Sequence, residues 1–263
     1  MKSICNLTLA VLSDIHGNLH ALNTVLDDIK KTEKVDGYLI LGDLVVGGPE
    51  PIGVLNRLSD LEYTQFVLGN SDRYIATGEY PGPKKCEIDS SPELIKTYTE
   101  IRNSYNWTRN LINDNGWLDW IQSLPLDYRC IIGDGTRVLC VHSEPGLDCG
   151  DGLNPTMKRS IIQSKLKMSN ADLILVGHTH CSIDLIFESV RLVNPGSVGM
   201  PLKTDLRASY SIMYANQESY RIDHRKVDYD RKKVIEKAII NCYPNVDYIK
   251  RNMEKGMKPQ WMQ

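Results

Sequence analysis

Short apolar runs in this chain are repeatedly followed by polar residues of the types that bind metal ions. Seven residues share this position, namely Asp14, His16, Asp43, Asn70, His142, His178 and His180. A short apolar run bounded by turn residues is typical of a buried strand, so each of the seven is expected to lie where a strand passes into a loop.

Strands and helices are expected to alternate in the first third of the chain. Leu7–Leu12 predicts a buried strand, and the apolar residues of Leu19–Lys30 form one helical stripe. Two more strands are expected at Tyr38–Leu41 and Gln65–Leu68, with a helix at Pro51–Leu61 between them. This alternation predicts an α/β fold whose parallel sheet gathers the polar residues at its carboxyl edge.

The alternation stops at residues 73–125, which contain no convincing strand. Helices are expected there at Pro92–Leu111 and Gly116–Leu124. We interpret residues 73–125 as a helical insertion that covers the sheet edge, within a single domain of residues 1–263.

The remaining residues predict a second sheet and a helical C-terminal part. Tyr128–Ile132 and Arg137–Val141 flank a Gly-Asp-Gly turn, which indicates a β-hairpin. Leu173–Val176 is expected to be a strand, and residues 183–227 are expected to be antiparallel strands of the second sheet. From about Asp230 the sequence is mostly helical.

Charge and cysteine content restrict the class of protein. Lys and Arg total 31 against 33 Asp and Glu, and this balance argues against a general nucleic-acid-binding surface. Seven cysteines without a CxxC pair suit a reducing compartment. No signal-peptide core or long apolar stretch is present, so we expect a cytoplasmic protein that does not enter a membrane.

Carboxylate, amide and imidazole donors together favour Mn²⁺, with Fe, Zn²⁺ or Ni²⁺ as alternatives. Each residue alone has a structural explanation, because Asp and Asn also cap helices and turns and His142 fits a buried core histidine. His178 and His180 either point to one side of an extended segment or diverge toward two ions. If Asp43 bridges, the seven side chains suffice for two ions about 3.5–4 Å apart.

Six motifs in order, spanning Leu9–Tyr214, resemble the calcineurin-like metallophosphoesterase superfamily. They are SDIHGN, LGDLVVGGPEP, LGNSD, VHSEP, VGHTH and NPGSVGMP. The chain is most similar to the compact bacterial and archaeal phosphodiesterase branch. This resemblance implies a four-layer α/β/β/α sandwich.

The resemblance also implies two ligand sets and a mechanism. The first ion is expected on Asp14, His16, Asp43 and His180, and the second on Asp43, Asn70, His142 and His178. A metal-bridging hydroxide would attack phosphorus in line, with Asp43, Asn70 and His142 as catalytic residues. Backbone amides of Gly17 and Gly69 are expected to contact phosphate, and Asn18 either orients the substrate or caps a helix.

Substrate selection is expected in the insertion. Candidates to stack on a base or contact a phosphate are Tyr98, Tyr105, Trp107 and Arg109, whose alternative role is ordinary helix packing. Many superfamily enzymes carry histidine at the position of Ser71, and serine is too weak an acid to protonate a leaving group. Asp72 is expected to contact His16 or Asn70, or alternatively to pair with Arg73.

These residues predict a binuclear metal-dependent hydrolase of phosphate esters. Ser71 favours a phosphodiesterase acting on a small phosphate ester or nucleotide-like substrate. A dinucleoside polyphosphate hydrolase and a phosphomonoesterase are alternatives within the same class. A noncatalytic scaffold, like a retromer subunit of this fold, is the alternative from another class. Homo-oligomer formation is left open by the sequence.

Overall fold

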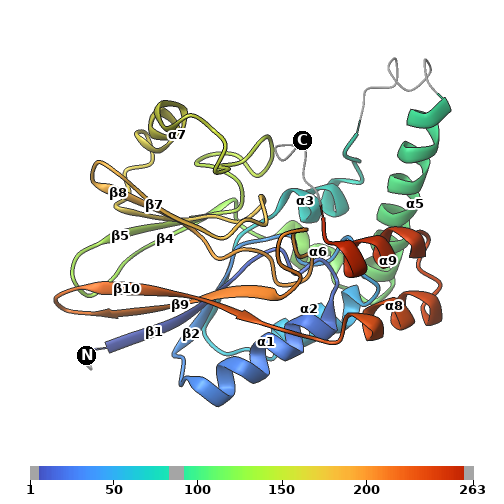
Figure 1. The fold of residues 1–263 in the computed structure, drawn as a ribbon, viewed down its shortest axis with the longest axis horizontal. Helices are drawn as coiled ribbons and strands as arrows, with labels where there is room; N and C mark the ends of the chain where they lie inside the picture. Colours follow the sequence, from blue (N-terminus) through green and yellow to red (C-terminus); the bar gives the residue numbers. More distant parts are fainter. Residues whose placement is uncertain (1–5, 83–91, 258–263) are drawn as a thin grey trace.

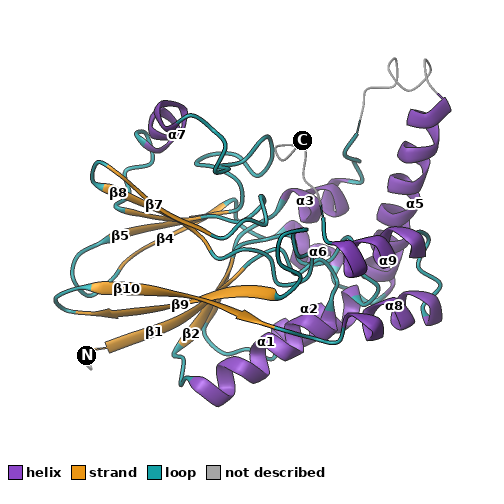
Figure 2. Ribbon diagram, in the orientation of Figure 1, coloured by secondary structure: helices purple, strands orange, loops and turns teal. Residues whose placement is uncertain are grey.

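Two five-stranded sheets lie face to face and are covered by helices on their outer sides (Figures 1 and 2). The structure is a computed structural model that describes residues 6–82 and 92–257. Its layers confirm the predicted four-layer α/β/β/α sandwich. Within the described ranges, no helix has both the length and the hydrophobicity needed to cross a membrane.

The first sheet is mixed, with the strand order β10-β9-β1-β2-β3. Its strands are β1 (Asn6–Leu12), β2 (Gly37–Ile40), β3 (Thr64–Phe66), β9 (Ala208–Asn216) and β10 (Tyr220–Val227). The predicted parallel part is β1-β2-β3. The antiparallel hairpin of β9 and β10 adds to the other side of β1.

The second sheet has the order β4-β5-β6-β8-β7. Its strands are β4 (Asp127–Ile131), β5 (Arg137–Val141), β6 (Leu173–Leu175), β7 (Ile183–Phe187) and β8 (Val190–Asn194). The predicted hairpin is the antiparallel pair of β4 and β5. The assignment of residues 183–227 to one sheet was wrong, because β9 pairs with β1 rather than with β8. Local periodicity cannot say which sheet receives a hairpin.

Helices cover the first sheet and crowd beyond one end of its strands (Figure 1). They are α1 (Leu19–Thr32), α2 (Pro51–Ser59), α3 (Asn70–Thr77), α5 (Pro92–Asp114), α6 (Leu118–Gln122), α8 (Arg231–Ile240) and α9 (Val246–Lys255). The helix α7 (Arg159–Leu166) lies over the second sheet. The sequence did not predict α3, because this helix has only 8 residues and its first four, Asn70–Arg73, are all polar. Residues 83–91 of the predicted insertion lie outside the described part.

Apolar packing fixes where the strands end. Val11, Leu41 and Met213 are buried between the two sheets with Cys140 and Leu175. On the other face of the first sheet, the buried stripe of α1 packs into a second cluster. The strand β1 begins near the N-terminus and runs toward the helices at the other end (Figure 1). The loops leaving β1, β2, β5 and β6 therefore meet at that carboxyl edge.

Candidate metal centre

Three of the predicted ligands form a buried group after β1 and β6. The Nε2 atoms of His16 and His180 are 3.1 Å apart, and Nε2 of His180 is 3.2 Å from Oδ1 of Asp14. Asp14 is fully buried, and His16 and His180 are each less than a tenth exposed. These three ligand atoms are close enough together to hold one ion.

A second group forms around Asn70, the first residue of α3. Its Oδ1 lies 2.8 Å from Nδ1 of His178 and 3.1 Å from Nε2 of His142. Asp43 lies between the two groups, with Oδ2 3.6 Å from Nε2 of His16 and Oδ1 3.4 Å from Nε2 of His142. Each oxygen of Asp43 therefore faces a different group, which is the arrangement that a bridging carboxylate requires.

The two histidines of the His-Thr-His segment diverge. His180 joins Asp14 and His16, whereas His178 joins Asn70 and His142. Of the two arrangements that the sequence left open, the structure has the one in which the two side chains diverge toward different groups of predicted ligands. Both residues have left-handed backbone, with φ of 65° for His178 and 57° for His180, which turns successive side chains away from a strand-like alternation.

Backbone carbonyls hold the four imidazoles. Each ring places one nitrogen on a carbonyl oxygen, so the ring N–H donates outward and the other nitrogen faces the centre, where it can give its lone pair to a metal ion once it is deprotonated. The carbonyls are those of Val46 for His16, Leu41 for His142, Gly150 for His178 and Met200 for His180, at 2.6, 2.6, 2.8 and 2.8 Å. Sequence reasoning missed these partners, because any residue type supplies a carbonyl.

Backbone strain is concentrated at the centre. In the part of the chain that the structure describes, nine residues other than glycine have positive φ, and five of them are predicted ligands. These five are Asp14, His16, Asp43, His178 and His180. Gly69 adds close packing, because a Cβ there would lie 2.3 Å from Oδ1 of Asp43. Such strain persists only where surrounding structure enforces it, and it is typical of functional sites.

The electrostatics of the centre are those of buried carboxylates and imidazoles that lie close enough to shift one another's pKa values. Burial lowers the pKa of His142, but the nearby charge of Asp43 outweighs burial and raises this pKa to about 10. Burial raises the pKa of Asp43, and the facing His142 and His16 lower it well below its usual value. Burial lowers the pKa of His16 and His178, so both rings are neutral at pH 7.

An unpartnered atom supports the fit of a metal ion. Oδ1 of Asp14 is buried and accepts no hydrogen bond of good geometry, although His180 is near. A buried carboxylate oxygen without a donor is costly, and a cation between it and the two facing imidazoles removes that cost. Oxygen and imidazole donors without a thiolate suit a divalent ion. The residues present therefore fit two divalent metal ions.

Several predicted substrate contacts have other partners. Asn18 is buried and caps α1, accepting from Ala21 N at 3.0 Å and donating to the carbonyl of Gly199 at 2.8 Å. The amide of Gly17 donates to the carbonyl of Leu44, and that of Gly69 donates to Asp72. Asn18 is therefore a capping residue, and neither glycine amide has a free proton for phosphate.

Two of the substrate candidates within residues 73–125, Trp107 and Arg109, contact other parts of the protein. Arg109 donates to the carbonyl of Ala76 at 3.1 Å, which is in the last turn of α3. Trp107 packs edge to face against Tyr243, with ring centroids 5.1 Å apart. The prediction that Arg109 binds substrate gains no support from these contacts, because its guanidinium already stabilises a helix end.

Asp72 holds two ligand loops together. Its carboxylate accepts from the amides of Leu44 at 2.9 Å and Gly69 at 3.1 Å. The expected contact with His16 or Asn70 was wrong, and so was the alternative ion pair, because Arg73 pairs with Asp148 and Glu79. Asp72 therefore joins the loop after β2 to the start of α3.

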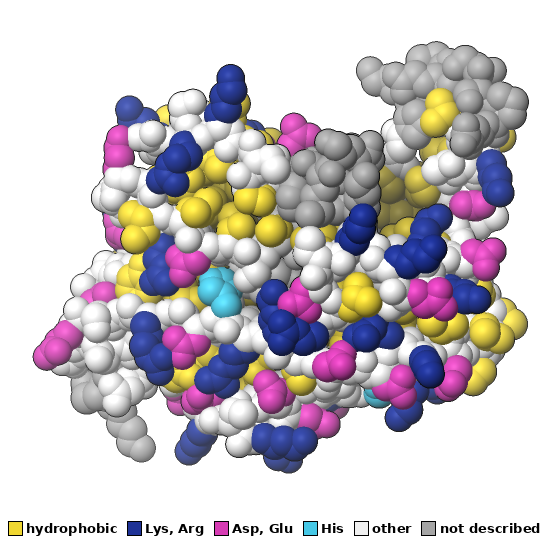
Figure 3. Space-filling model, viewed as in Figure 1, with side chains coloured by type: hydrophobic (Ala, Val, Ile, Leu, Met, Phe, Trp, Pro, Cys, Tyr) yellow, Lys and Arg dark blue, Asp and Glu magenta, His cyan; other side chains and the backbone are white. Residues whose placement is uncertain are grey.

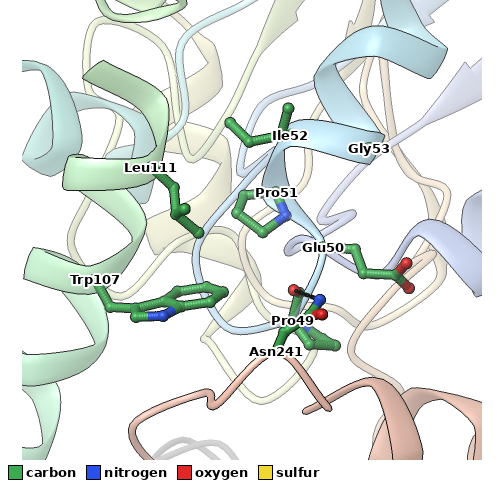
Figure 4. Close-up of a pocket in the computed structure, with 8 residues that line it drawn as sticks. All are labelled: Pro49, Glu50, Pro51, Ile52, Gly53, Trp107, Leu111 and Asn241. Atoms are coloured by element: carbon green, nitrogen blue, oxygen red, sulfur yellow. Dashed lines mark hydrogen bonds between the residues drawn. The ribbon is translucent and has the colours of Figure 1, made fainter. Parts of the chain in front are cut away.

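A cavity of about 390 Å³ lies beside the Gly47-Gly48-Pro49 loop (Figure 4). It is lined by Pro49, Glu50, Pro51, Ile52, Gly53, Trp107, Leu111 and Asn241. The side chain of Asn241 donates to the carbonyl of Pro49 at 2.9 Å. None of the seven predicted ligands lines this cavity, so it is separate from the metal centre.

Residues 7–182 match the calcineurin-like phosphoesterase family. The chain belongs to this family of phosphoesterases. It is 31% identical over 252 residues to an uncharacterized protein of Methanocaldococcus jannaschii, covering 90% of this chain and 93% of that one. A hypothetical protein of Pyrococcus horikoshii has a similar structure, with a TM-score of 0.78, 22% identity and 96% and 100% coverage of the two chains.

Two further comparisons differ in extent. A metallophosphoesterase from Sphaerobacter thermophilus covers 95% of this chain and 99% of its own, with a TM-score of 0.71 and 24% identity. A symmetrical bis(5'-nucleosyl)-tetraphosphatase of Erwinia tasmaniensis is 35% identical over 100 residues, which is 38% of this chain and 36% of that enzyme. The first likeness concerns the whole fold, and the second concerns only a part of each chain.

Proposed function

We propose that this protein is a binuclear, manganese-dependent phosphodiesterase acting on small nucleotide-like substrates. The observation that carries the proposal is Asp43, which faces a three-residue group through each of its two oxygens. Two divalent ions held there would neutralise phosphate charge and supply a water of lowered pKa. The chain's own part is to hold these ligands in place through the four carbonyl contacts and the loop connection made by Asp72.

Ser71 supports the preference for diesters. Its hydroxyl donates to Oδ2 of Asp43 at 2.9 Å and its amide donates to Oδ1, also at 2.9 Å. A hydroxyl committed to a carboxylate has no second proton for a leaving group. General acid assistance is worth about 10²–10⁴-fold, mainly for poor leaving groups. Substrates whose leaving groups need less protonation, such as activated diesters and phosphoanhydrides, therefore suit this centre.

The surface agrees with a small substrate rather than a nucleic acid. On the face seen in Figure 3, basic and acidic side chains are interspersed, and no continuous basic stripe crosses it. Residues 73–125 supply α5 and α6, and α5 contacts α2 and α3. We propose that this segment is an insertion of the single domain, placed beside the centre where it limits substrate size.

The test is hydrolysis of bis-p-nitrophenyl phosphate and p-nitrophenyl phosphate in Mn²⁺. We expect faster turnover of the diester, and loss of turnover in Asp43→Ala with the fold retained by circular dichroism. Asp127→Ala is the matched control, because this carboxylate lies on the exposed edge strand β4. Wild-type kcat in metal-loaded Asp43→Ala would contradict the bridging role, and a faster monoester would contradict the diester preference.

A dinucleoside polyphosphate hydrolase is the second candidate. It is favoured by the likeness to the symmetrical tetraphosphatase over 100 residues. Hydrolysis of diadenosine tetraphosphate, followed by separation of the products, distinguishes it from a diesterase. Efficient cleavage of the anhydride with little cleavage of the diester would select this second candidate.

A further inference from the structure

The His-Thr-His segment after β6 has a backbone conformation that needs support from its surroundings. His178 and His180 both have positive φ, and the amide of Thr179 between them donates to the carbonyl of Gly177 at 2.7 Å. Left-handed backbone in residues other than glycine persists only where neighbouring contacts enforce it. The side chains that hold this segment therefore decide where the two imidazoles point.

Asn194, the last residue of β8, makes two of these contacts. Its Nδ2 donates to the carbonyl of Gly177 at 2.6 Å and to Oγ1 of Thr179 at 3.1 Å, so its two N–H groups hold the segment on both sides of His178. Asn194 and Thr179 are almost fully buried. A third contact comes from the predicted ligand Asp14, whose Oδ2 accepts from the amide of His178 at 3.1 Å. Asn194 thus supports the segment without being a ligand.

The carboxamide of Asn194 is itself held in one orientation. Its Oδ1 accepts from the amide of Gly196 at 2.8 Å. A flipped carboxamide would place Nδ2 against this amide and Oδ1 against the carbonyl of Gly177, so donor would face donor and acceptor would face acceptor. The strand β8 pairs in parallel with β6, which brings Asn194 beside the chain that leaves β6. The donors of Asn194 are therefore in place before any ion binds.

We propose that Asn194 is a positioning residue for both ions of the metal centre. By fixing the carbonyl before His178 and the side chain that follows it, Asn194 keeps His178 directed toward Asn70 and His180 directed toward Asp14. Because the two histidines belong to different groups, one buried side chain affects both. This inference rests on the proposed function, because it requires the two groups to bind metal.

The experiment is titration of the metal-free protein with Mn²⁺ by calorimetry. Asn194→Ala removes both contacts and leaves all seven predicted ligands in place. Outer partners of metal ligands are typically worth 10–100-fold in metal affinity, so we expect both binding events to weaken by about tenfold or more.

Co²⁺ gives a second readout, because its visible absorption depends on the ligands that surround it. The spectrum of bound Co²⁺ should differ between Asn194→Ala and the wild type, since the imidazoles are no longer held in place. A residue needed only for stability would lower the melting temperature and leave the spectrum of bound Co²⁺ unchanged.

Asn216→Ala is the matched control. Asn216 is also the last residue of a strand, β9, and its Oδ1 also accepts from an amide two residues further on, that of Glu218 at 2.8 Å. It lies opposite Asn6 at the start of β1, away from the carboxyl edge where the predicted ligands meet. This variant should bind both metals like the wild type and give the same Co²⁺ spectrum.

Thr179 allows a narrower test of the same contact. Thr179→Val removes the hydroxyl that Asn194 contacts and keeps the volume of the side chain, whereas Thr179→Ser keeps the hydroxyl. We expect weaker Mn²⁺ binding in Thr179→Val than in Thr179→Ser. The losses of Asn194→Ala and Thr179→Val should be less than additive in the double variant, because both remove one shared contact.

Four results would overturn the inference: wild-type affinity for either ion in Asn194→Ala, an unchanged Co²⁺ spectrum in that variant, equal losses in Asn194→Ala and Asn216→Ala, or additive losses in the double variant. Should Asn194→Ala not fold, equal Mn²⁺ affinities of Thr179→Val and Thr179→Ser would overturn it. A wild-type protein that binds neither Mn²⁺ nor Co²⁺ would defeat both the inference and the proposed function. A wild-type protein that binds two ions but hydrolyses no ester would defeat the proposed function alone.

Discussion

At the carboxyl ends of β1 and β2 the chain buries charged side chains on left-handed backbone, whereas the side chains at their amino ends are mostly apolar or tyrosine and are largely only partly buried or exposed. The amino end has a cavity of about 530 Å³ between the sheets, lined by residues that include Leu9, Leu39 and Tyr128. Of its non-glycine lining residues only Tyr63 has positive φ. The strain and the buried charge are thus concentrated at one end of the strands, where a ligand would be bound.

The largest contrast is expected between Asp14→Ala and Leu39→Ala. Asp14→Ala removes a ligand of the first group, so kcat/KM should fall by about 10³-fold, since a metal ion contributes several kcal/mol. Leu39→Ala leaves the ligands intact but opens space between the sheets, so the free energy of unfolding should fall by about 2–5 kcal/mol with kcat retained. Kinetics and urea denaturation check both. Equal loss of activity in the two variants would contradict the division between the ends.

The next prediction concerns pH. In the metal-free protein the pKa of His142 is raised to about 10, so at neutral pH both ring nitrogens carry a proton and the ring is positively charged. The pKa of His180 is also raised, because burial, which lowers it, is outweighed by the charge of Asp14. A metal ion must displace these protons, so Mn²⁺ affinity should rise with pH, by at least about tenfold per unit between pH 6.5 and 8.5.

Calorimetry in two buffers of different ionisation enthalpy counts the released protons. His142→Asn removes the proton of His142, so binding to this variant should release fewer protons than binding to the wild type. An affinity that does not change with pH would contradict the protonated state assigned to His142. The amino end, which has no histidine among its lining residues, should contribute nothing to this dependence.

The smallest effect is expected for Arg109→Ala. The guanidinium donates to the carbonyl of Ala76 in the last turn of α3, so its loss should lower the free energy of unfolding by about 0.5–1.5 kcal/mol. We expect kcat/KM to stay within about twofold of the wild type, because its hydrogen bond is to a helix end. Steady-state kinetics with the diester checks this. A KM raised tenfold or more would restore the predicted role of Arg109 in substrate binding.

Prediction from sequence succeeded for elements that a local pattern of apolar residues defines. The apolar runs at β1, β2 and β6 and the stripe of α1 are local patterns, and the structure has them where they were expected. It failed where the outcome depends on distant pairing. The strand β9 shows no local sign that it pairs with β1, and Asp72 shows none that it accepts from Leu44.

The sequence alone determined the α/β alternation and the side chains available for metal binding, because apolar periodicity and ordered polar motifs are properties of the chain itself. The family and the four layers followed from the resemblance that those motifs carry. Only the tertiary structure decided that His178 and His180 separate, that Asn18 donates to the carbonyl of Gly199, and that Asp72 accepts from the amide of Leu44. These contacts join residues far apart in sequence, and their geometry follows from backbone conformation and burial. The backbone conformation of these loops and the burial of their side chains are established only when the two sheets pack together.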